Sequence, residues 1–380
     1  MPVRTLVSTA LLLIGCTLLP GCAADAQKGA PGGKPVAQGA NAPAPQPAPA
    51  AQAPAAAASY GSAASASTAC MTRLQARLDT AAAAQRADST RKRPGSGRDP
   101  VYAVEKGWYP KMPAFRDGSI LPCSRVVAYY GNPREKKMGV LGEYPRDEMF
   151  RRFDRQVDEW RKADPATPVV PAFHLVSVVA QGDPGKSGKY RMIMPDTLLK
   201  EVYGWARQKN GIFIIDVQVG QDRLQNLLPR FEWILKQPDV MLAIDPEFSM
   251  HYRSEGRKPG TKIGTFDAAD VNYASEFLES MVEKYNLPPK LLIVHRFTRL
   301  MVTNARQISL RPHLQIVMDM DGWGDPWLKY DSYKDYIVKE PVQFTGWKGF
   351  YHNDERKGTP ILKPADMLKL HPTPLYIQYQ

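Results

Sequence analysis

Residues 240–248 read VMLAIDPEF, and they are the clearest indication of the fold in this sequence. An apolar run that passes directly into two acidic residues is typical of a buried parallel strand whose carboxyl end carries a functional site. Similar β-rich runs occupy residues 126–130, 169–179, 212–217, 291–294, 314–318, 344–351 and 375–379. Together with 240–244 they make eight runs, which alternate with helical segments and predict a closed parallel barrel.

The segments between these runs have the hydrophobic spacing of amphipathic helices, at 147–162, 196–208, 222–236 and 267–285. The part of the chain from Arg125 to Gln380 holds 380 − 125 + 1 = 256 residues, the usual size of a (β/α)8 barrel. A doubly wound open sheet is the alternative. It normally has a glycine-rich phosphate loop after its first strand, and Gly131-Asn132-Pro133 is no such loop.

The N-terminus has the features of an export signal. Arg4 supplies a positive charge, residues 6–19 are mostly apolar, and Leu19-Pro20-Gly21-Cys22 follows. This ending resembles the lipobox of bacterial lipoproteins, which implies a signal peptide at 1–21 and a lipid on Cys22. The alternative is an ordinary signal peptide cleaved nearby. Later residues contain no run of roughly 18 apolar residues, so we expect no second membrane anchor.

Composition divides the rest of the region before the barrel into two parts. Residues 22–69 are mostly Ala, Pro, Gly, Gln and Ser and predict a disordered tether. Residues 70–124 form a basic lead-in segment, in which 70–117 hold ten Lys or Arg against five Asp or Glu. This segment is expected to be solvated, although it could also contact anionic lipid or wall polymers. The net charge of +12 suits the cell envelope outside the cytoplasm, where a nucleic-acid partner is not expected.

The cysteines predict one disulfide. Cys16 leaves with the signal peptide and Cys22 takes the lipid, so Cys70 and Cys123 remain in an oxidising compartment. Two separately buried thiols are the alternative.

Polar residues stand where the predicted strands end. Active sites of such barrels lie at the carboxyl ends of the strands, and residues two apart on a strand share a face. If Leu242 and Ile244 pack outward, Asp245 and Glu247 point into the barrel, and Asp319 and Asp321 do so on the sixth strand. The candidate site therefore comprises Glu247, Asp245 and Asp319 as catalytic residues, and Tyr130, His174, Asp216, His295, Asp321, Trp323, Trp347, Tyr376 and Gln378 as substrate-binding residues.

Several of these residues also have purely structural interpretations. Asp216 and Asp321 could cap loops or helices, the two histidines could be satisfied core residues, and Glu247 could pair with Arg296.

Two short motifs resemble a known family. Asp245-Pro246-Glu247 is similar to the Asp-x-Glu of muramidase-type glycoside hydrolase barrels, and residues 376–380, YIQYQ, resemble their closing Trp-Gln-Tyr. Those enzymes carry an aspartate at the end of strand one, where this chain has Tyr129, Tyr130 and Asn132. The whole chain resembles a group of exported bacterial barrel lipoproteins, a likeness that implies no activity.

Two functions remain after this reasoning. The first is glycoside hydrolysis of a wall glycan, with Glu247 as the acid and Asp319 or Asp245 as its partner. The second is a non-catalytic barrel that binds glycan or another envelope protein. A metal-dependent hydrolase ranks third. A mixed site could be formed by His174, His295, Asp216, Asp245 and Asp319, but no compact His-x-His or His-Glu-x-x-His motif supports it, and we expect no cofactor and no metal.

Overall fold

The structure is a computed structural model that describes residues 70, 72, 113 and 115–380. The predicted signal peptide, the lipid-attachment Cys22 and the tether lie outside the described residues, as does most of the basic lead-in segment. In the described part of the chain, no helix has the length and apolar character that crossing a membrane requires.

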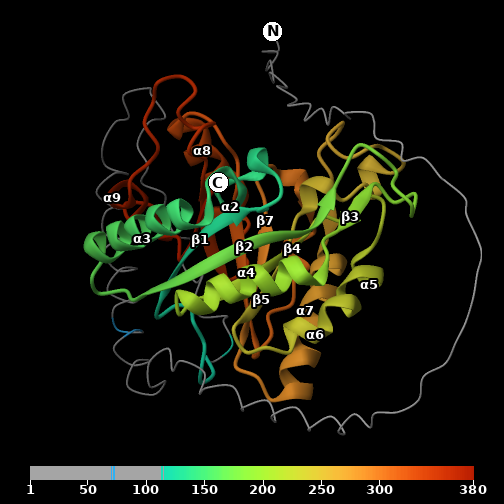
Figure 1. Cartoon of the computed structure of the whole chain (residues 1–380), viewed down its shortest axis with the longest axis horizontal. Helices are drawn as coiled ribbons and strands as arrows, with labels where there is room; N and C mark the ends of the chain where they lie inside the picture. The colour runs from blue at the N-terminus through green and yellow to red at the C-terminus, as the bar shows by residue number, and fades with distance from the viewer. Residues whose placement is uncertain (1–69, 71, 73–112, 114) are drawn as a thin grey trace, which may run out of the picture. The chain divides into compact units, whose positions relative to one another are not determined.

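Eight parallel strands close into a barrel, as the sequence predicts (Figure 1). Their order around the barrel is β1-β2-β4-β5-β7-β9-β10-β11, and β11 pairs with β1 to complete the ring. The strands are β1 Arg125–Gly131, β2 Val169–Ala180, β4 Ile212–Val217, β5 Val240–Ile244, β7 Lys290–His295, β9 Leu314–Met320, β10 Phe344–Gly349 and β11 Tyr376–Tyr379.

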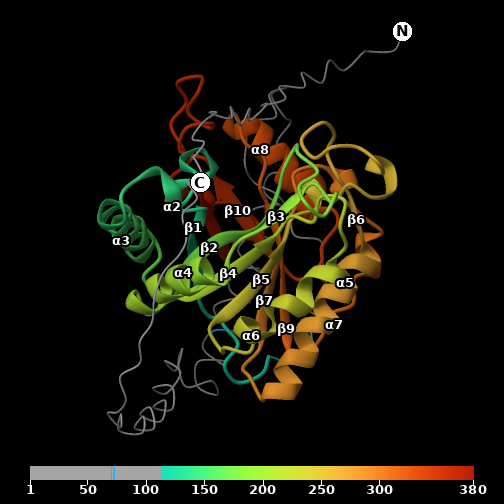
Figure 2. The ribbon, with the colours of Figure 1, turned by 45° about the vertical axis from the view of Figure 1, so that its right-hand side comes forward.

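Three long helices lie along the outside of the strands (Figures 1 and 2). They are α3 Arg146–Ala163, α4 Asp196–Gln208 and α7 Ala268–Tyr285. Asp267 begins α7 with a capping box in which its side chain accepts from the helix backbone and Asp270 accepts from the Asp267 N–H. The predicted helix 222–236 is broken into α5 Leu224–Leu227, η3 Leu228–Phe231 and α6 Glu232–Leu235. Pro229 lies at the break and lacks the N–H that a continuous helix needs.

The remaining connections contain only short elements, so the ring of helices is incomplete. Between β7 and β9 the described chain forms only η6 Arg299–Met301, β8 Val302–Thr303 and η7 Ala305–Gln307. The other short elements are η2 Lys136–Met138, α2 Val140–Glu143, β3 Arg191–Ile193, η4 Pro246–Phe248, η5 Tyr252–Ser254, β6 Phe266–Asp267, α8 Pro326–Ser332, the π-helical η8 Tyr333–Val338 and α9 Pro364–Met367.

Side chains alternate between two apolar cores, which is the pattern the strand parity predicts. Leu242, Ile244, Ile316 and Met318 pack outward with the helices. The barrel interior is filled by the residues between them, including Ala128, Ala172, Ile214, Ala243, Ile293 and Val317. The interior is therefore a packed core, and chemistry is confined to its end.

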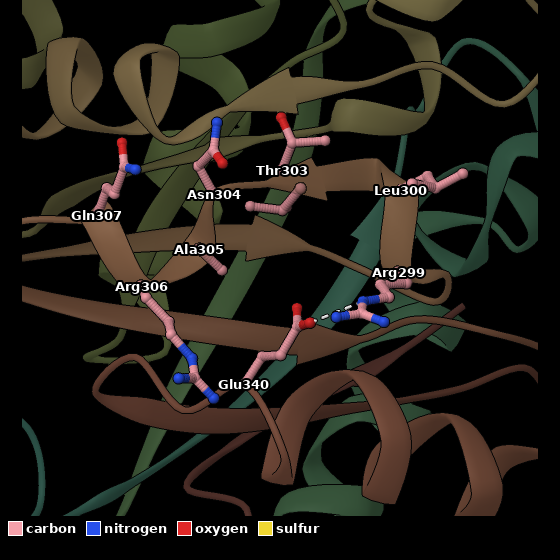
Figure 3. Close-up of a pocket in the computed structure, with 9 residues that line it drawn as sticks. Arg299, Leu300, Thr303, Asn304, Ala305, Arg306, Gln307 and Glu340 are labelled. Atoms are coloured by element: carbon pink, nitrogen blue, oxygen red, sulfur yellow. Dashed lines mark hydrogen bonds and ion pairs between the residues drawn. The ribbon is translucent and has the colours of Figure 1, made fainter.

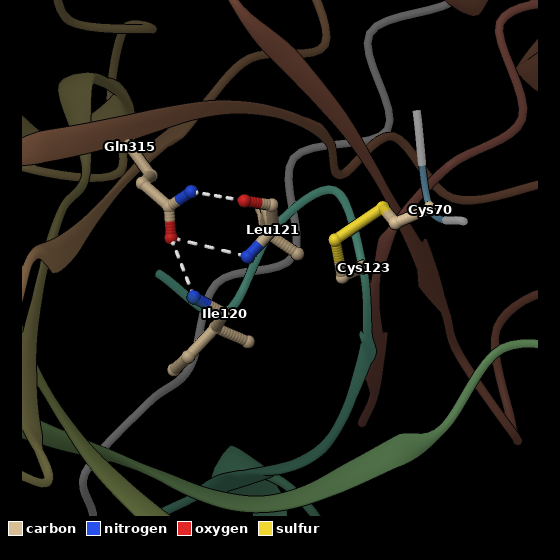
Figure 4. Close-up of a disulfide and its surroundings, with 5 residues drawn as sticks. All are labelled: Cys70, Ile120, Leu121, Cys123 and Gln315. Atoms are coloured by element: carbon tan, nitrogen blue, oxygen red, sulfur yellow. Dashed lines mark hydrogen bonds between the residues drawn. A yellow bond between two sulfur atoms is a disulfide. The ribbon is translucent and has the colours of Figure 1, made fainter. Parts of the chain in front are cut away.

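The last residues of the lead-in segment close the amino end of the barrel. Ile120 and Leu121 belong to the interior core, and both of their N–H groups donate to Gln315 Oε1, at 3.0 and 3.1 Å (Figure 4). Cys70 is joined to Cys123, the pair expected from the cysteine count, with Cα atoms 5.3 Å apart. A cross-link that spans 53 residues stabilises a fold by about 4 kcal/mol on the chain-entropy estimate.

Candidate functional site

A layer of polar side chains lies on top of the apolar barrel interior, at the carboxyl ends of the strands. Each barrel strand, or the residue directly after it, contributes one side chain to this layer. All of them are 4 % exposed or less: Tyr130, His174, Asp216, Asp245, His295, Asp319, Lys348 and Gln378. Alternation places them there, because each stands two residues beyond an inward-facing residue of the layer below.

Glu247 and Asp245 form a pair of carboxyl groups at the end of β5. Asp245 Oδ1 accepts the backbone N–H of Glu247 at 2.9 Å, and Asp245 Oδ2 accepts from Gln218 Nε2 at 3.2 Å. Glu247 is half-buried, and its carboxyl makes no hydrogen bond within the described part of the chain. The two acids therefore differ in environment: Asp245 is held by two donors, whereas Glu247 is half-buried and accepts no hydrogen bond within the described residues.

The pKa values of both acids are displaced upward. Burial raises the pKa of Glu247 to about 8, and the negative charges of Asp245 and Asp321 add to this rise. Burial also raises the pKa of Asp245 to about 7, although the charge of His295 partly opposes it. Both donors to Asp245 stabilise its ionised form, so Asp245 is the member of the pair that loses its proton first.

A second cluster lies in the same layer and is more deeply buried. Asp216 Oδ2 lies 3.5 Å from His174 Nε2 and 3.6 Å from His295 Nε2. The other ring nitrogen of His295, Nδ1, lies 3.4 Å from Asp319 Oδ2 and 3.3 Å from Asp321 Oδ2. The two histidines thus share one carboxylate, and His295 faces two more.

The charges in this cluster are strongly coupled. Burial opposes ionisation of Asp216, but its contacts with His174 and His295 hold its pKa well below the ordinary value. Burial likewise opposes protonation of His295, yet Asp216, Asp319 and Asp321 raise its pKa well above the usual value. Desolvation lowers the pKa of His174 to about 4. In the protein without added ligands, His295 is therefore the charged imidazole and His174 the neutral one.

Tyr376 and Gln378 lie beneath this cluster on β11. The Tyr376 hydroxyl lies 2.6 Å from His174 Nδ1 and donates to Gln378 Oε1 at 3.0 Å. Both side chains are fully buried. The Tyr376 hydroxyl orients the imidazole of His174, and the role of Tyr376 and Gln378 in substrate binding stays a prediction.

Two residues that the sequence reasoning overlooked complete the layer. Lys348 Nζ lies 3.8 Å from the centre of the Tyr130 ring and provides a positive charge among the carboxylates. Gly346 leaves space for its neighbours, because a Cβ at this position would lie 2.5 Å from Asp319 Oδ1. The inward parity of 346 and 348 on β10 was the signal available for both.

The aromatic predictions have mixed outcomes. Trp347 faces outward from β10, is fully buried and packs against Tyr330 and Tyr333, so its prediction as a substrate-binding residue is corrected to a core role. Tyr130 lies within the layer, with its ring centre 5.0 Å from that of His174. Trp323 is 38 % exposed, stands three residues after the end of β9, and has the Arg356 guanidinium 5.9 Å from its ring centre.

The structural alternative for Glu247 does not hold. Arg296 pairs with Glu340 through Nη2 and also donates to the backbone oxygens of Tyr336, Arg299 and Val302. Its guanidinium is therefore occupied elsewhere, and Glu247 is not its ion-pair partner. A surface pocket beside this pair is lined by residues 299, 300, 302–307 and 340, none of which is a predicted site residue (Figure 3).

These features define the class of protein: an α/β barrel with a buried acidic and imidazole layer at the carboxyl end of its strands. Comparison with protein-family models and with curated proteins found no match.

Proposed function

We propose that this chain is a lipid-anchored protein of the cell envelope whose barrel hydrolyses glycosidic bonds in a polysaccharide or wall glycan. The observation that carries the proposal is the Asp245–Glu247 pair. One carboxyl is held by two donors while the other is half-exposed and unbonded within the described chain. Glycosidases require such a division between an ionised carboxylate and a protonated acid.

Glu247 acts as the general acid in this proposal. Its carboxyl reaches solvent, and its raised pKa keeps the proton on it near neutral pH. It donates this proton to the glycosidic oxygen as the bond to the anomeric carbon breaks.

Asp245 acts as the ionised partner. It either removes a proton from the attacking water or attacks the anomeric carbon itself, and the anomeric configuration of the product distinguishes these routes. Asp319, the other candidate partner from the sequence, is fully buried and faces His295, which leaves it without access to a sugar.

The surrounding side chains suit a carbohydrate. Trp323 offers an exposed ring, and the charges of Lys348 and Asp321 act on Glu247 in opposite directions, the first lowering and the second raising its pKa. No metal or cofactor is needed for these steps.

The experiment is a hydrolysis and binding assay across a panel of wall glycans and polysaccharides, with reducing ends as the readout. Release of reducing ends by the wild type and a loss of at least about a hundredfold in Glu247→Gln support the proposal. Binding to a panel member without hydrolysis, unchanged in Glu247→Gln, would instead identify a glycan-binding module. Loss of membrane retention in Cys22→Ser tests the lipid anchor, since a single lipidated cysteine is the proposed attachment.

A further inference from the structure

The buried cluster at the centre of the polar layer has no role in the proposed hydrolysis, yet its composition is that of a ligand set. His174 Nε2, both carboxylate oxygens of Asp216, and both ring nitrogens of His295 are buried and lack a hydrogen-bond partner within the described part of the chain. All three residues are 1 % exposed or less. Buried polar atoms ordinarily form hydrogen bonds, and a group of such atoms without them requires an explanation.

The separations are too long for good hydrogen bonds and suit a shared cation. His174 Nε2 and His295 Nε2 lie 3.5 and 3.6 Å from Asp216 Oδ2, beyond the usual range for an N–H···O bond. Ligand atoms at about 2.0–2.1 Å from a tetrahedral ion lie roughly 3.3 Å from one another. One ligand atom from each residue can be chosen so that all three lie within 4.8 Å of one another. The two separations from Asp216 Oδ2 exceed that value by only a few tenths of an ångström, so each imidazole is close to the position it would take beside an ion shared with this oxygen.

The hydrogen bonds of the residues behind the cluster also indicate a cation site. Tyr376 donates to Gln378, so the Tyr376 oxygen receives the proton of His174 Nδ1 at 2.6 Å. This tautomer leaves the lone pair of His174 Nε2 facing the Asp216 carboxylate, an arrangement that repels unless a cation lies between them. On the other side, His295 Nδ1 faces the Asp319 and Asp321 carboxylates at 3.4 and 3.3 Å. A second shell of carboxylates and hydroxyls behind ligating histidines is typical of metal sites.

The charge balance of the layer also favours a divalent cation. Asp216, Asp319 and Asp321 place carboxylate oxygens 3.3–3.6 Å from the ring nitrogens of His295. A divalent ion held by neutral imidazoles would offset two of these negative charges, where a proton on His295 offsets one.

We propose that His174, Asp216 and His295 bind a divalent transition-metal ion such as Zn²⁺. The ligand atoms are Nε2 of each imidazole and Oδ2 of the carboxylate. Three protein ligands of nitrogen and oxygen type suit Zn²⁺ and leave a fourth position for water. The sequence offered these residues only within a larger mixed set, because they stand on β2, β4 and β7 and only closure of the barrel brings these three together.

A second histidine and carboxylate group provides a matched control. Glu279, Glu283 and His313 also lie within reach of a common ion. Here His313 Nδ1 is also buried without a hydrogen-bond partner, but Arg311 already pairs with Glu279 at 2.7 Å and the Glu283 side chain is 64 % exposed, so the two carboxylates are paired or solvated. We expect no specific ion there.

The test titrates Co²⁺ and Zn²⁺ into the purified full-length chain after chelator treatment, with visible absorption of Co²⁺ and thermal unfolding as readouts. Wild type should bind one equivalent at this site, with the absorption of a low-coordinate Co²⁺ ion and a raised unfolding temperature. Asp216→Asn should weaken binding by at least about a hundredfold, and Tyr376→Phe by about 10- to 100-fold, the range for second-shell changes. His313→Gln should change it less than about twofold.

Failure of the wild type to bind an equivalent, or binding that survives Asp216→Asn but is lost in His313→Gln, would overturn the assignment. If Asp216→Asn does not fold, Tyr376→Phe decides, since it removes only the hydroxyl behind His174; unchanged affinity there would also overturn it. Metal binding is read without any glycan, so the result stands or falls separately from the proposed hydrolysis.

Discussion

Asp245 holds the backbone of Glu247 in place, because its Oδ1 accepts the Glu247 N–H at 2.9 Å. Pro246 lies between them and fixes its own φ, so the peptide that connects the two acids has little freedom. This contact keeps one acid as an acceptor while the other stays half-exposed with its proton available. Because the pKa of Glu247 is raised, the folded protein is less stable at high pH, and this loss can be measured.

The first prediction concerns that cost. The folded-state pKa of Glu247 is raised above 4.5, so its contribution to stability is fully present below pH 4.5 and is lost as pH rises toward about 8. Glu247→Gln cannot ionise, so its stability relative to wild type should increase between about pH 5.5 and pH 9. Urea unfolding at both pH values measures this difference.

Glu255→Gln, an exposed residue in the following loop, is the control and should show the same relative stability at both pH values. A Glu247→Gln variant whose relative stability is also independent of pH would show that Glu247 is not held in its protonated form.

The second prediction concerns the tight approach at Gly346. A Cβ there would lie 2.5 Å from Asp319 Oδ1 and 3.0 Å from Tyr376 Cδ1, and both of these side chains are fully buried. Gly346→Ala should therefore lower the free energy of unfolding by about 1–3 kcal/mol. Gly204→Ala, in helix α4 with open space around the position, should be neutral or stabilising by up to about 1 kcal/mol. Equal effects of the two substitutions in urea unfolding would contradict the packing described for β10.

The third prediction concerns the buried ion pair next to the layer. Lys329 Nζ contacts Asp354 Oδ2 at 2.5 Å and donates to the Lys348 carbonyl at 2.7 Å, with both charged side chains nearly inaccessible. Asp354→Asn would leave the ammonium buried without its counter-charge, and we expect a loss of about 3–5 kcal/mol. Asp325→Asn breaks the pair with Lys357, whose side chain is 76 % exposed, and should cost less than about 1 kcal/mol. Thermal or urea unfolding of both variants measures the difference between the two losses of stability. A loss below about 1 kcal/mol in Asp354→Asn would contradict the buried ion pair.

The barrel could be predicted from the sequence because its signals are local. Each strand is an apolar run ending in a polar residue, and alternation alone placed Ala243 inward and Leu242 outward, as observed. The Cys70–Cys123 pair could be predicted by elimination. These inferences needed no knowledge of which strands are neighbours.

The site features that the sequence could not predict depend on contacts between strands that are far apart in the chain. The identification of Trp347 as a ligand-binding aromatic failed because the parity of β10 was not applied to it, and the same oversight hid Lys348. The partnership of His174 with Tyr376 joins residues 202 apart, and no spacing rule encodes it. Helix 222–236 was expected to be continuous because its apolar spacing outweighed the single Pro229.

The most direct test of the proposed hydrolysis is the pH dependence of kcat/KM on a wall-type glycan, for wild type and for Glu247→Gln. The reaction needs Asp245 ionised and Glu247 protonated, so the wild-type rate should rise as pH passes about 7 and fall as it passes about 8. In Glu247→Gln, kcat/KM should be at least about a hundredfold lower and should no longer decrease at high pH. Glu255→Gln should keep both the wild-type kcat/KM and its decrease at high pH. A wild type that binds glycan without cleaving it, or a Glu247→Gln variant with an unchanged rate and profile, would contradict the assignment of Glu247 as the acid.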